Sequence, residues 1–276
     1  MGTMEWPLVL FTVLGETAIG IIFVLWWLDR AEVDPIFYKK AALLSGLLLA
    51  LALIASLFHL GRPEYAYRAV SHLSTSWLSR EILCFLFAAV AWLYFYSQVR
   101  QPKGKRRLAA GITSTFGLLG IFSSSMIYVL PRVPAWDSVQ TPLFFLLTTG
   151  LLGGLTCLVL GRKTLKLSQL QELLLIVFTC VLVSILSFAI YLSMLNTAGM
   201  EGMSTVQFLL ASPLFWLRVV ANWLLPLILL VTYFSKQKTI NANLVIMLFI
   251  ACSIGELLGR ALFYLSAVGI SITALK

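Results

Sequence analysis

The sequence predicts an all-α membrane protein, a single bundle of eight transmembrane helices. Of its 276 residues, 60% are hydrophobic and only 11% are charged. A soluble domain carries about 25% charged residues, and one of this size could not hide so much apolar surface from water. The net charge of +9 must therefore be interpreted by where it falls relative to the membrane, and it does not predict a nucleic-acid partner.

Eight apolar segments, each close to the ~20 residues that a spanning helix needs, predict the transmembrane helices. The connections are short and polar, and no linker divides the chain, so we expect one integral membrane domain over residues 1–276. The first segment lacks the flanks of a signal peptide, and we interpret it as a retained span. The expected spans cover residues 6–28, 38–59, 81–99, 108–130, 142–160, 172–195, 214–234 and 243–267.

The distribution of basic residues predicts the orientation. Of the 20 Lys and Arg residues, 13 lie in four alternate loops, at 29–40, 100–107, 161–171 and 235–242. Because cytoplasmic loops are enriched in Lys and Arg, this bias places those loops inside and both termini outside. In the inner membrane of a bacterium, the outside is the periplasm.

Several kinds of site are excluded or disfavoured by the residue types. The four cysteines lie singly within apolar segments, whereas an iron–sulfur cluster needs grouped thiolates. Of the two histidines, His72 falls in a loop, so no facing pair is available to hold haem. His, Cys and carboxylate residues do not cluster as a metal site requires, and we expect no metal.

Ionisable residues at or within the spans are the candidate functional residues, because each is costly to place in hydrocarbon. His59 and Glu81 fall at the outer ends of consecutive helices. Glu256 and Arg260 are four residues apart and could pair on one helix face. We expect a polar pocket on the outer side. The candidate residues are Glu16, His59, Glu81, Arg218, Glu256 and Arg260.

Structural roles compete with functional ones at these positions. His59 could cap helix carbonyls or meet lipid headgroups, and Glu81 could be a first-turn acid favoured by the helix dipole. Glu16 and the Glu256–Arg260 pair could simply hold helices together. The outer aromatic residues fit the interfacial belt better than ligand contacts; they are Tyr65, Tyr67, Trp77 and Trp136.

A quinol fits a histidine and a carboxylate at the membrane edge. Each of its two hydroxyl groups needs a proton acceptor as electrons leave, and its tail needs an opening toward hydrocarbon. A neutral imidazole suits one hydroxyl, and a partly buried carboxylate suits the other. We therefore predict His59 and Glu81 as the proton acceptors. The redox centre that takes the electrons must come from a partner.

Several motifs, in order along nearly the whole chain, carry a resemblance to a known family. They are EWPLVLFTVLG, FHLGRPEYAYRA followed by LSREI, VPAWDSVQTPLFFLLTTGLLGG at 133–154 and GELLGRALFY at 255–264. In these motifs and their spacing the chain resembles the membrane anchor subunit of bacterial dimethyl sulfoxide reductase. Glu16 departs from the family pattern. At its position the pattern leads us to expect a residue with an uncharged amide side chain.

The resemblance implies an anchor that binds and oxidises menaquinol in anaerobic respiration, without haem or an iron–sulfur cluster of its own. It implies two partners on the periplasmic face: an iron–sulfur subunit that accepts the electrons, and a molybdopterin catalytic subunit that reduces dimethyl sulfoxide or a related oxide. The family's quinol-site histidine matches His59, and its acidic residue matches Glu81. The remaining candidate quinol-binding residues are Arg62, Arg218, Glu256 and Arg260.

Two other functions remain open on the sequence. A proton- or ion-coupled secondary transporter would use Glu16, Glu81 and Glu256, although such proteins favour inverted repeats and we find none. An inert membrane tether would need neither His59 nor Glu81 for turnover.

We predict that an alkaline phosphatase reporter fused after Lys276 is active, because the basic loops place both termini outside, where its disulfides can form. The same reporter inserted in the 100–107 loop should be inactive. Activity measured on whole cells checks both fusions, and the opposite pattern would reverse the topology.

Overall fold

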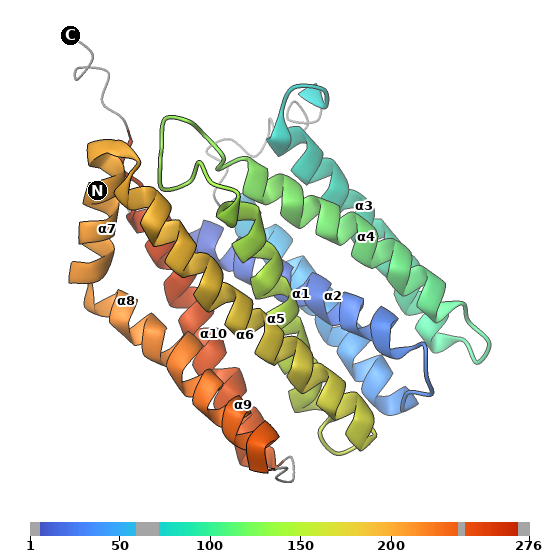
Figure 1. The fold of residues 1–276 in the computed structure, drawn as a ribbon. Helices are drawn as coiled ribbons and strands as arrows, with labels where there is room; N and C mark the ends of the chain where they lie inside the picture. Colours follow the sequence, from blue (N-terminus) through green and yellow to red (C-terminus); the bar gives the residue numbers. More distant parts are fainter. Residues whose placement is uncertain (1–5, 59–71, 237–240, 270–276) are drawn as a thin grey trace.

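A computed structural model describes residues 6–58, 72–236 and 241–269, and these residues form a bundle of helices without a β-strand (Figure 1). Eight helical segments of the described chain are long and apolar enough to cross a membrane, which confirms the predicted number. They are α1 (Trp6–Leu28), α2 (Pro35–Leu57), α3 (Trp77–Arg100), α4 (Arg106–Met126), α5 (Gln140–Gly161), α6 (Leu167–Asn196), a seventh span over Pro213–Ser235, and α10 (Ala242–Leu265).

Local side chains explain where two of these helices begin. The Asp34 carboxylate accepts a hydrogen bond of 2.7 Å from the Phe37 N–H, and Pro35 occupies the first turn of α2, where its missing N–H costs nothing. This cap starts α2 at Pro35, three residues before the expected boundary at 38. Asn241 caps α10 in the same way, through a 2.7 Å bond from the Leu244 N–H.

The seventh span is not one continuous α-helix. It consists of α8 (Pro213–Arg218), the π-helical turn η2 (Val219–Leu224) and α9 (Leu225–Lys236). Pro226 follows the turn, and it has no N–H to donate to the carbonyl four residues earlier, so the regular α-helical ladder is already interrupted here. Such π-helical turns often lie at functional sites.

A short helix, α7 (Gly199–Ala211), connects the sixth and seventh spans and is not among the segments expected from the sequence. Gly199 adopts a φ of +78°, which allows the chain to reverse after α6. The Thr205 hydroxyl donates to the Ser266 carbonyl at 3.1 Å and thereby joins α7 to the end of α10. With 13 residues, α7 is too short to cross the membrane.

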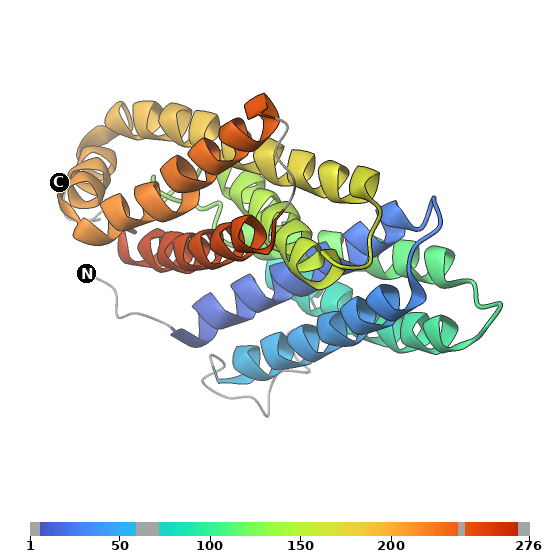
Figure 2. The same cartoon turned by 90° about the horizontal axis from the view of Figure 1, so that it is seen from below.

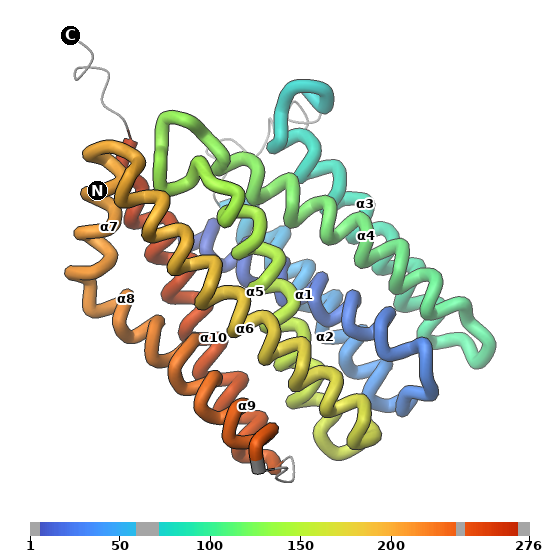
Figure 3. Tube along the Cα trace, viewed as in Figure 1, coloured from blue at the N-terminus to red at the C-terminus, as the bar shows by residue number. Residues whose placement is uncertain are grey.

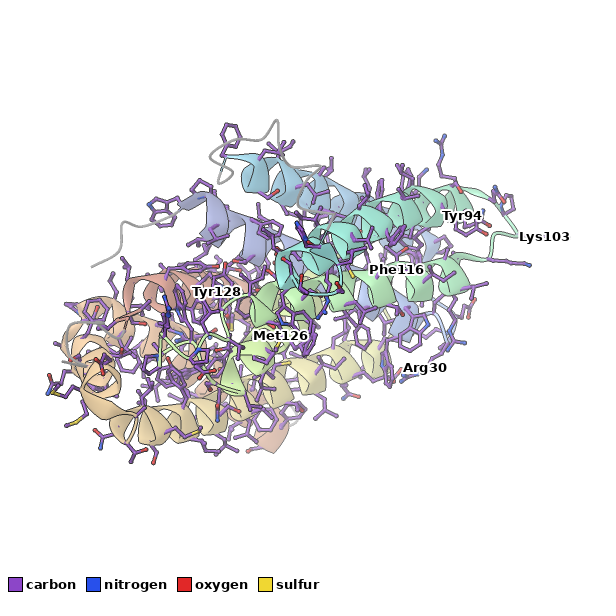
Figure 4. All side chains as sticks on the ribbon, turned by 90° about the horizontal axis from the view of Figure 1, so that it is seen from above. Arg30, Tyr94, Lys103, Phe116, Met126 and Tyr128 are labelled. Atoms are coloured by element: carbon purple, nitrogen blue, oxygen red, sulfur yellow. The ribbon has the colours of Figure 1, made fainter. Side chains whose placement is uncertain are left out.

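The connections alternate between the two ends of the bundle (Figures 1 and 3). One end, here called the basic end, carries loops 29–34, 101–105 and 162–166. The other, the terminal end, carries the start of α1, loop 127–139, α7 and the end of α10. Figure 4 shows Arg30 and Lys103 at the basic end and Tyr128 toward the terminal end. The fold thus brings these basic loops together, while the side of the membrane that they face stays a prediction.

Helix α1 is the most enclosed of the spans and packs against α2, α4, α5 and α10; Figure 2 shows α5 between α1 and α6. Two glycines determine the α1–α5 crossing. A Cβ atom on Gly20 would stand 2.0 Å from the Thr149 carbonyl oxygen, and one on Gly153 would stand 2.3 Å from the Gly20 carbonyl carbon. Small residues allow such close backbone contact between membrane helices.

We predict that Gly153→Ala destabilises the protein, whereas Gly154→Ala does not. A methyl group at 153 would overlap the α1 backbone, which costs about 1–3 kcal/mol for overpacking. The nearest atom to a Cβ at the adjacent Gly154 would be Cγ2 of Val177, at an ordinary 3.4 Å. Unfolding midpoints of the two variants in detergent check this, and equal midpoints would contradict it.

Candidate functional site

A network of buried polar side chains forms where α1, α5, the seventh span and α10 meet. Four of its members are charged, two carboxylates and two guanidinium groups, and all lie at most 8% exposed. Because hydrocarbon does not solvate charge, each must find a partner within the protein or in a ligand. The members of this polar network are Glu16, Thr148, Arg218, Asn222, Glu256 and Arg260.

The first and last helices are joined by an ion pair in this network. Nη2 of Arg260 lies 2.5 and 2.7 Å from the two carboxylate oxygens of Glu16, and the Arg260 guanidinium carbon stands 3.6 Å from the Phe145 ring centroid. Arg260 therefore pairs with Glu16 and not with Glu256 on its own helix, which the sequence offered as a possible partner. The spacing of four residues permits that pair, but Glu16 approaches from α1 and takes its place.

Glu256 has other partners. One of its oxygens accepts a 2.7 Å hydrogen bond from the Thr148 hydroxyl of α5, and the other accepts a 2.7 Å bond from the Asn222 amide of the π-helical turn. Gly255 makes this contact possible, since a Cβ there would stand 2.4 Å from the Asn222 Cβ. The π-helical turn therefore presents Asn222 to a carboxylate of the neighbouring helix.

A partly open cavity lies beside the network, between α5, α6, α7, the seventh span and α10. Three of the candidate residues, Arg218, Glu256 and Arg260, line it, so the structure confirms that they lie together. The rest of the wall is mixed and includes five aromatic side chains, which are Phe144, Phe145, Phe188, Tyr191 and Phe263. We call this space the Arg218 cavity.

Glu81 is not among the residues that line the Arg218 cavity. It is a buried residue near the start of α3, and its carboxylate interacts with Ser124 of α4. The sequence predicts an outer polar pocket from His59, Glu81, Arg218 and Arg260. In the described residues, Glu81 lies at the α3–α4 contact, whereas Arg218, Glu256 and Arg260 line the Arg218 cavity.

Tyr128, in the loop after α4, contacts the wall of the Arg218 cavity. Its ring centroid lies 6.0 Å from that of Phe145 and 5.4 Å from that of Phe263, two residues of the cavity wall. Its hydroxyl is 3.2 Å from that of Tyr264. Burial above all, and then its neighbours Tyr264 and Glu81, raise the pKa of Tyr128 well above its ordinary value. Its phenol therefore stays protonated and able to donate a hydrogen bond.

His59 and Arg62 lie outside the described residues, so the predicted pairing of His59 with Glu81 stays a prediction. The described chain leaves α2 after Leu57 and enters α3 at Trp77, and both points are at the terminal end (Figure 1). In the described part of the chain, no group of three His, Cys, Asp or Glu residues could hold a metal ion.

Sequence reasoning missed several residues of the site. Asn222 and Thr148 are polar but uncharged, so a search for ionisable residues within the spans passes over them. Tyr128 and Gly259, a residue of α10 that lines the Arg218 cavity, carry no signal of their own, because tyrosines are common at membrane interfaces and glycines are common in membrane helices. Of these four residues, Asn222 was the easiest to recognise from the sequence, because it is an amide in an otherwise apolar segment.

A family model and the names of similar proteins both relate this chain to subunits of dimethyl sulfoxide reductases. Residues 1–265 match the family model described as DMSO reductase anchor subunit (DmsC). The anaerobic dimethyl sulfoxide reductase chain YnfH of Escherichia coli (strain K12) is 28% identical over 281 residues, 95% of each chain. A chain of the anaerobic dimethyl sulfoxide reductase of Haemophilus influenzae is 30% identical over 161 residues, 56% of this chain and 57% of the relative. A subunit of the sulfite dehydrogenase of Allochromatium vinosum is 37% identical over 107 residues, 36% of this chain and 32% of the relative.

We predict that Glu16→Gln destabilises the protein by about 3–5 kcal/mol, because it leaves the Arg260 charge buried without its partner. The double variant Glu16→Gln with Arg260→Met should recover much of that loss, since it removes both charges. Unfolding midpoints of the single and double variants measure the coupling.

The exposed pair of Lys166 and Glu32, at 3.1 Å, is the matched control. The corresponding changes Glu32→Gln and Lys166→Met should each shift stability by less than about 1 kcal/mol. Additive effects of the Glu16 and Arg260 changes would show that the buried pair does not couple α1 to α10.

Proposed function

Because the chain belongs to the family of DMSO reductase anchor subunits (DmsC), we propose that it binds menaquinol, oxidises it on the periplasmic side, and passes the electrons to an iron–sulfur partner. Family membership and the eight candidate spans make it a multi-pass membrane anchor, one chain of a multi-subunit enzyme. Quinol oxidation is the step that an anchor without a prosthetic group can contribute through its own side chains.

Among the described residues, the Glu81 carboxylate has few partners, and this observation carries the proposal. A carboxylate offers about four lone-pair positions for hydrogen bonds, and in the described residues Glu81 interacts with Ser124. The remaining positions suit a quinol hydroxyl. Glu81 would accept one proton as electrons leave, and His59 would accept the other.

Tyr128 supports the same assignment. Its phenol stays protonated beside Glu81, so it can donate a hydrogen bond but does not compete for the quinol protons. Protons taken from the quinol by Glu81 would leave at the terminal end, which the basic loops predict to be periplasmic.

The terminal end also offers a surface for the iron–sulfur partner. Loop 127–139 is held to the bundle through Trp136, whose indole donates to the Phe263 carbonyl at 2.9 Å, and through Ala135, whose carbonyl accepts from the Tyr191 hydroxyl at 2.7 Å. Val139 is 81% exposed on this fixed loop. A rigid loop loses little entropy on binding, and it would bring the partner's cluster toward Glu81.

The names of the relatives guide the choice of terminal acceptor. YnfH, which matches nearly the whole chain, is a chain of a dimethyl sulfoxide reductase, and the sulfite dehydrogenase subunit matches only about a third of it. We propose dimethyl sulfoxide or a related oxide, reduced in a molybdopterin catalytic subunit. A secondary transporter is less well supported, because Glu16 and Glu256, two of its candidate ion sites, already have protein partners.

We predict that Glu81→Gln and His59→Leu each lower menaquinol-dependent turnover at least about 100-fold, since each replaces a proton acceptor by a group of similar size. Turnover driven by a reduced dye, which feeds the partner's clusters directly, should persist. Both activities are measured on the same membranes, and Glu172→Gln, an exposed carboxylate in its ion pair with Arg30, is the matched control.

Two outcomes would contradict this assignment. If menaquinol turnover survives in both variants, the chain is an inert tether. If both activities disappear together with the assembled complex, Glu81 and His59 have a structural role.

A further inference from the structure

We propose that the basic end of the bundle binds an anionic phospholipid, with a hydrocarbon chain in a groove along α4 and the phosphate at the start of that helix. The site is separate from Glu81 and from the polar network, and it does not depend on quinol oxidation. The inference rests on an apolar groove in a membrane-spanning helix and on basic side chains, without acidic partners, where that groove begins.

The groove, here called the α4 groove, lies between α4 and one side chain of α1, and it has a volume of about 310 Å³. The Thr115 hydroxyl in its wall donates to the Gly111 carbonyl of the same helix at 2.9 Å, so this polar group is already bonded. Apolar cavities of about 150 Å³ bind benzene, and the α4 groove therefore has room for a segment of a hydrocarbon chain. Its lining residues are Trp26, Leu108, Gly111, Ile112, Thr115 and Phe116.

Gly111 and Trp26 shape the groove. A Cβ atom on Gly111 would stand 3.0 Å from Nε1 of Trp26, so the missing side chain lets the indole lie against α4. Trp26 comes two residues before the end of α1, at the basic end. Tryptophan is enriched at this level of a membrane, where its ring meets hydrocarbon and its N–H meets headgroups. The α4 groove thus begins at headgroup level.

From there the α4 groove runs into the part of the bundle that hydrocarbon surrounds. Leu108 and Ile112 are exposed apolar residues of a candidate span, which is the pattern of a surface in contact with lipid. Figure 4 shows Lys103 at the basic end and Phe116 farther along α4. A lipid chain that enters beside Leu108 would therefore follow the helix toward the middle of the membrane.

Basic side chains without acidic partners stand where the groove begins. Lys105 and Arg107 are exposed, and neither forms an ion pair within the described part of the chain. Segment 100–107 contains five basic residues and no Asp or Glu. Three other basic residues of this end are already paired with carboxylates; the pairs are Arg30–Glu172, Arg106–Asp29 and Lys166–Glu32. The charge of Lys105 and Arg107 is therefore available to an anion.

Helix geometry aligns this charge with the groove. Arg107 precedes Gly111 by four residues, so the two share one face of α4. Long side chains on a helix lean toward its N-terminus, and an arginine in this place reaches headgroup level while its stem covers apolar surface. No side chain caps the start of α4, so the positive end of its helix dipole adds to the same potential.

An anionic phospholipid satisfies both parts of the site at once. Its phosphate supplies the counter-charge for Lys105 and Arg107, and its chain fills the α4 groove. A neutral lipid or a quinone would leave the basic side chains without a counter-charge, and free phosphate would leave the groove without an apolar occupant. Basic pockets between membrane helices on the cytoplasmic side bind anionic headgroups, and the basic loops predict this end to be cytoplasmic.

The experiment titrates the purified full chain, in a neutral detergent, with dioleoyl phosphatidylglycerol. Dioleoyl phosphatidylcholine, which has the same chains and no net charge, is the comparison lipid. Native mass spectrometry measures the affinity of the first lipid bound. Phosphatidylglycerol should bind at least about 10-fold more tightly, because each basic side chain near an anionic headgroup contributes about fivefold in affinity.

Charge variants test the phosphate position. Arg107→Gln should weaken phosphatidylglycerol binding about fivefold, and the double variant with Lys105→Gln should weaken it about 25-fold, while phosphatidylcholine binding stays unchanged. Arg132→Gln is the matched control, because it makes the same change at an exposed arginine of the terminal end, and it should alter neither affinity.

A second pair of variants tests the groove. Ile112→Trp places a large side chain in it and should weaken the binding of both lipids at least about fivefold by excluding the chain. Leu119→Trp makes a similar change at an exposed apolar residue of α4 that does not line the groove, and it should have no effect.

Three outcomes would overturn the site. Equal affinities of the two lipids for the wild type would show that the head is not recognised by charge. Equal losses in Arg107→Gln and Arg132→Gln would reduce the effect to general attraction by a basic protein. Equal effects of Ile112→Trp and Leu119→Trp would show that the lipid chain does not occupy the α4 groove.

Discussion

The ion pair between Glu16 and Arg260 is the interaction on which the centre of this protein depends. It joins the first span to the last, across 244 residues of sequence, through contacts of 2.5 and 2.7 Å. Hydrocarbon does not solvate a charge, so each of these two charged groups needs the other. The pair therefore requires that α1 and α10 keep their relative positions. Because Arg260 is occupied by Glu16, Glu256 bonds to Thr148 and Asn222 instead, and Arg218 has no carboxylate partner among the described residues.

Close packing makes this arrangement possible. Gly20 and Gly153 let α1 and α5 touch backbone to backbone, and Gly259 lets the Arg218 guanidinium lie on α10. At Gly20 and Gly153 a side chain would push the helices apart. In a membrane, where apolar surfaces gain little by leaving lipid, such contacts and buried polar bonds hold helices together. The glycines and the charges therefore serve one purpose, which is to keep the helices that carry the site at fixed distances.

The chemistry follows from how this packing distributes acceptors and donors. In the described residues Glu81 interacts with Ser124 at the α3–α4 contact, so under the proposed function its remaining acceptor positions would serve a quinol that must lose protons. Arg218 has no hydrogen-bond or ion-pair partner among the described residues and lines a small cavity beside the polar network. Tyr128 is buried, stays protonated and contacts the wall of that cavity.

The sequence by itself determined the class of the protein, the number of spans, the shared end of the basic loops, and which charged residues are buried. These features are local: an apolar run of about 20 residues forms a spanning helix wherever it occurs, and a charge within it is costly in any fold. The family was also recognisable, because its motifs keep their order. Only the tertiary structure decided that Arg260 pairs with Glu16 rather than Glu256. It also decided that Arg218 stays unpaired in the described part of the chain and that Glu81 does not line the cavity. The partners of these side chains come from different helices, so they depend on how the helices cross. Crossings that depend on single glycines leave no periodic pattern in the sequence, and the pairs therefore could not be predicted from it.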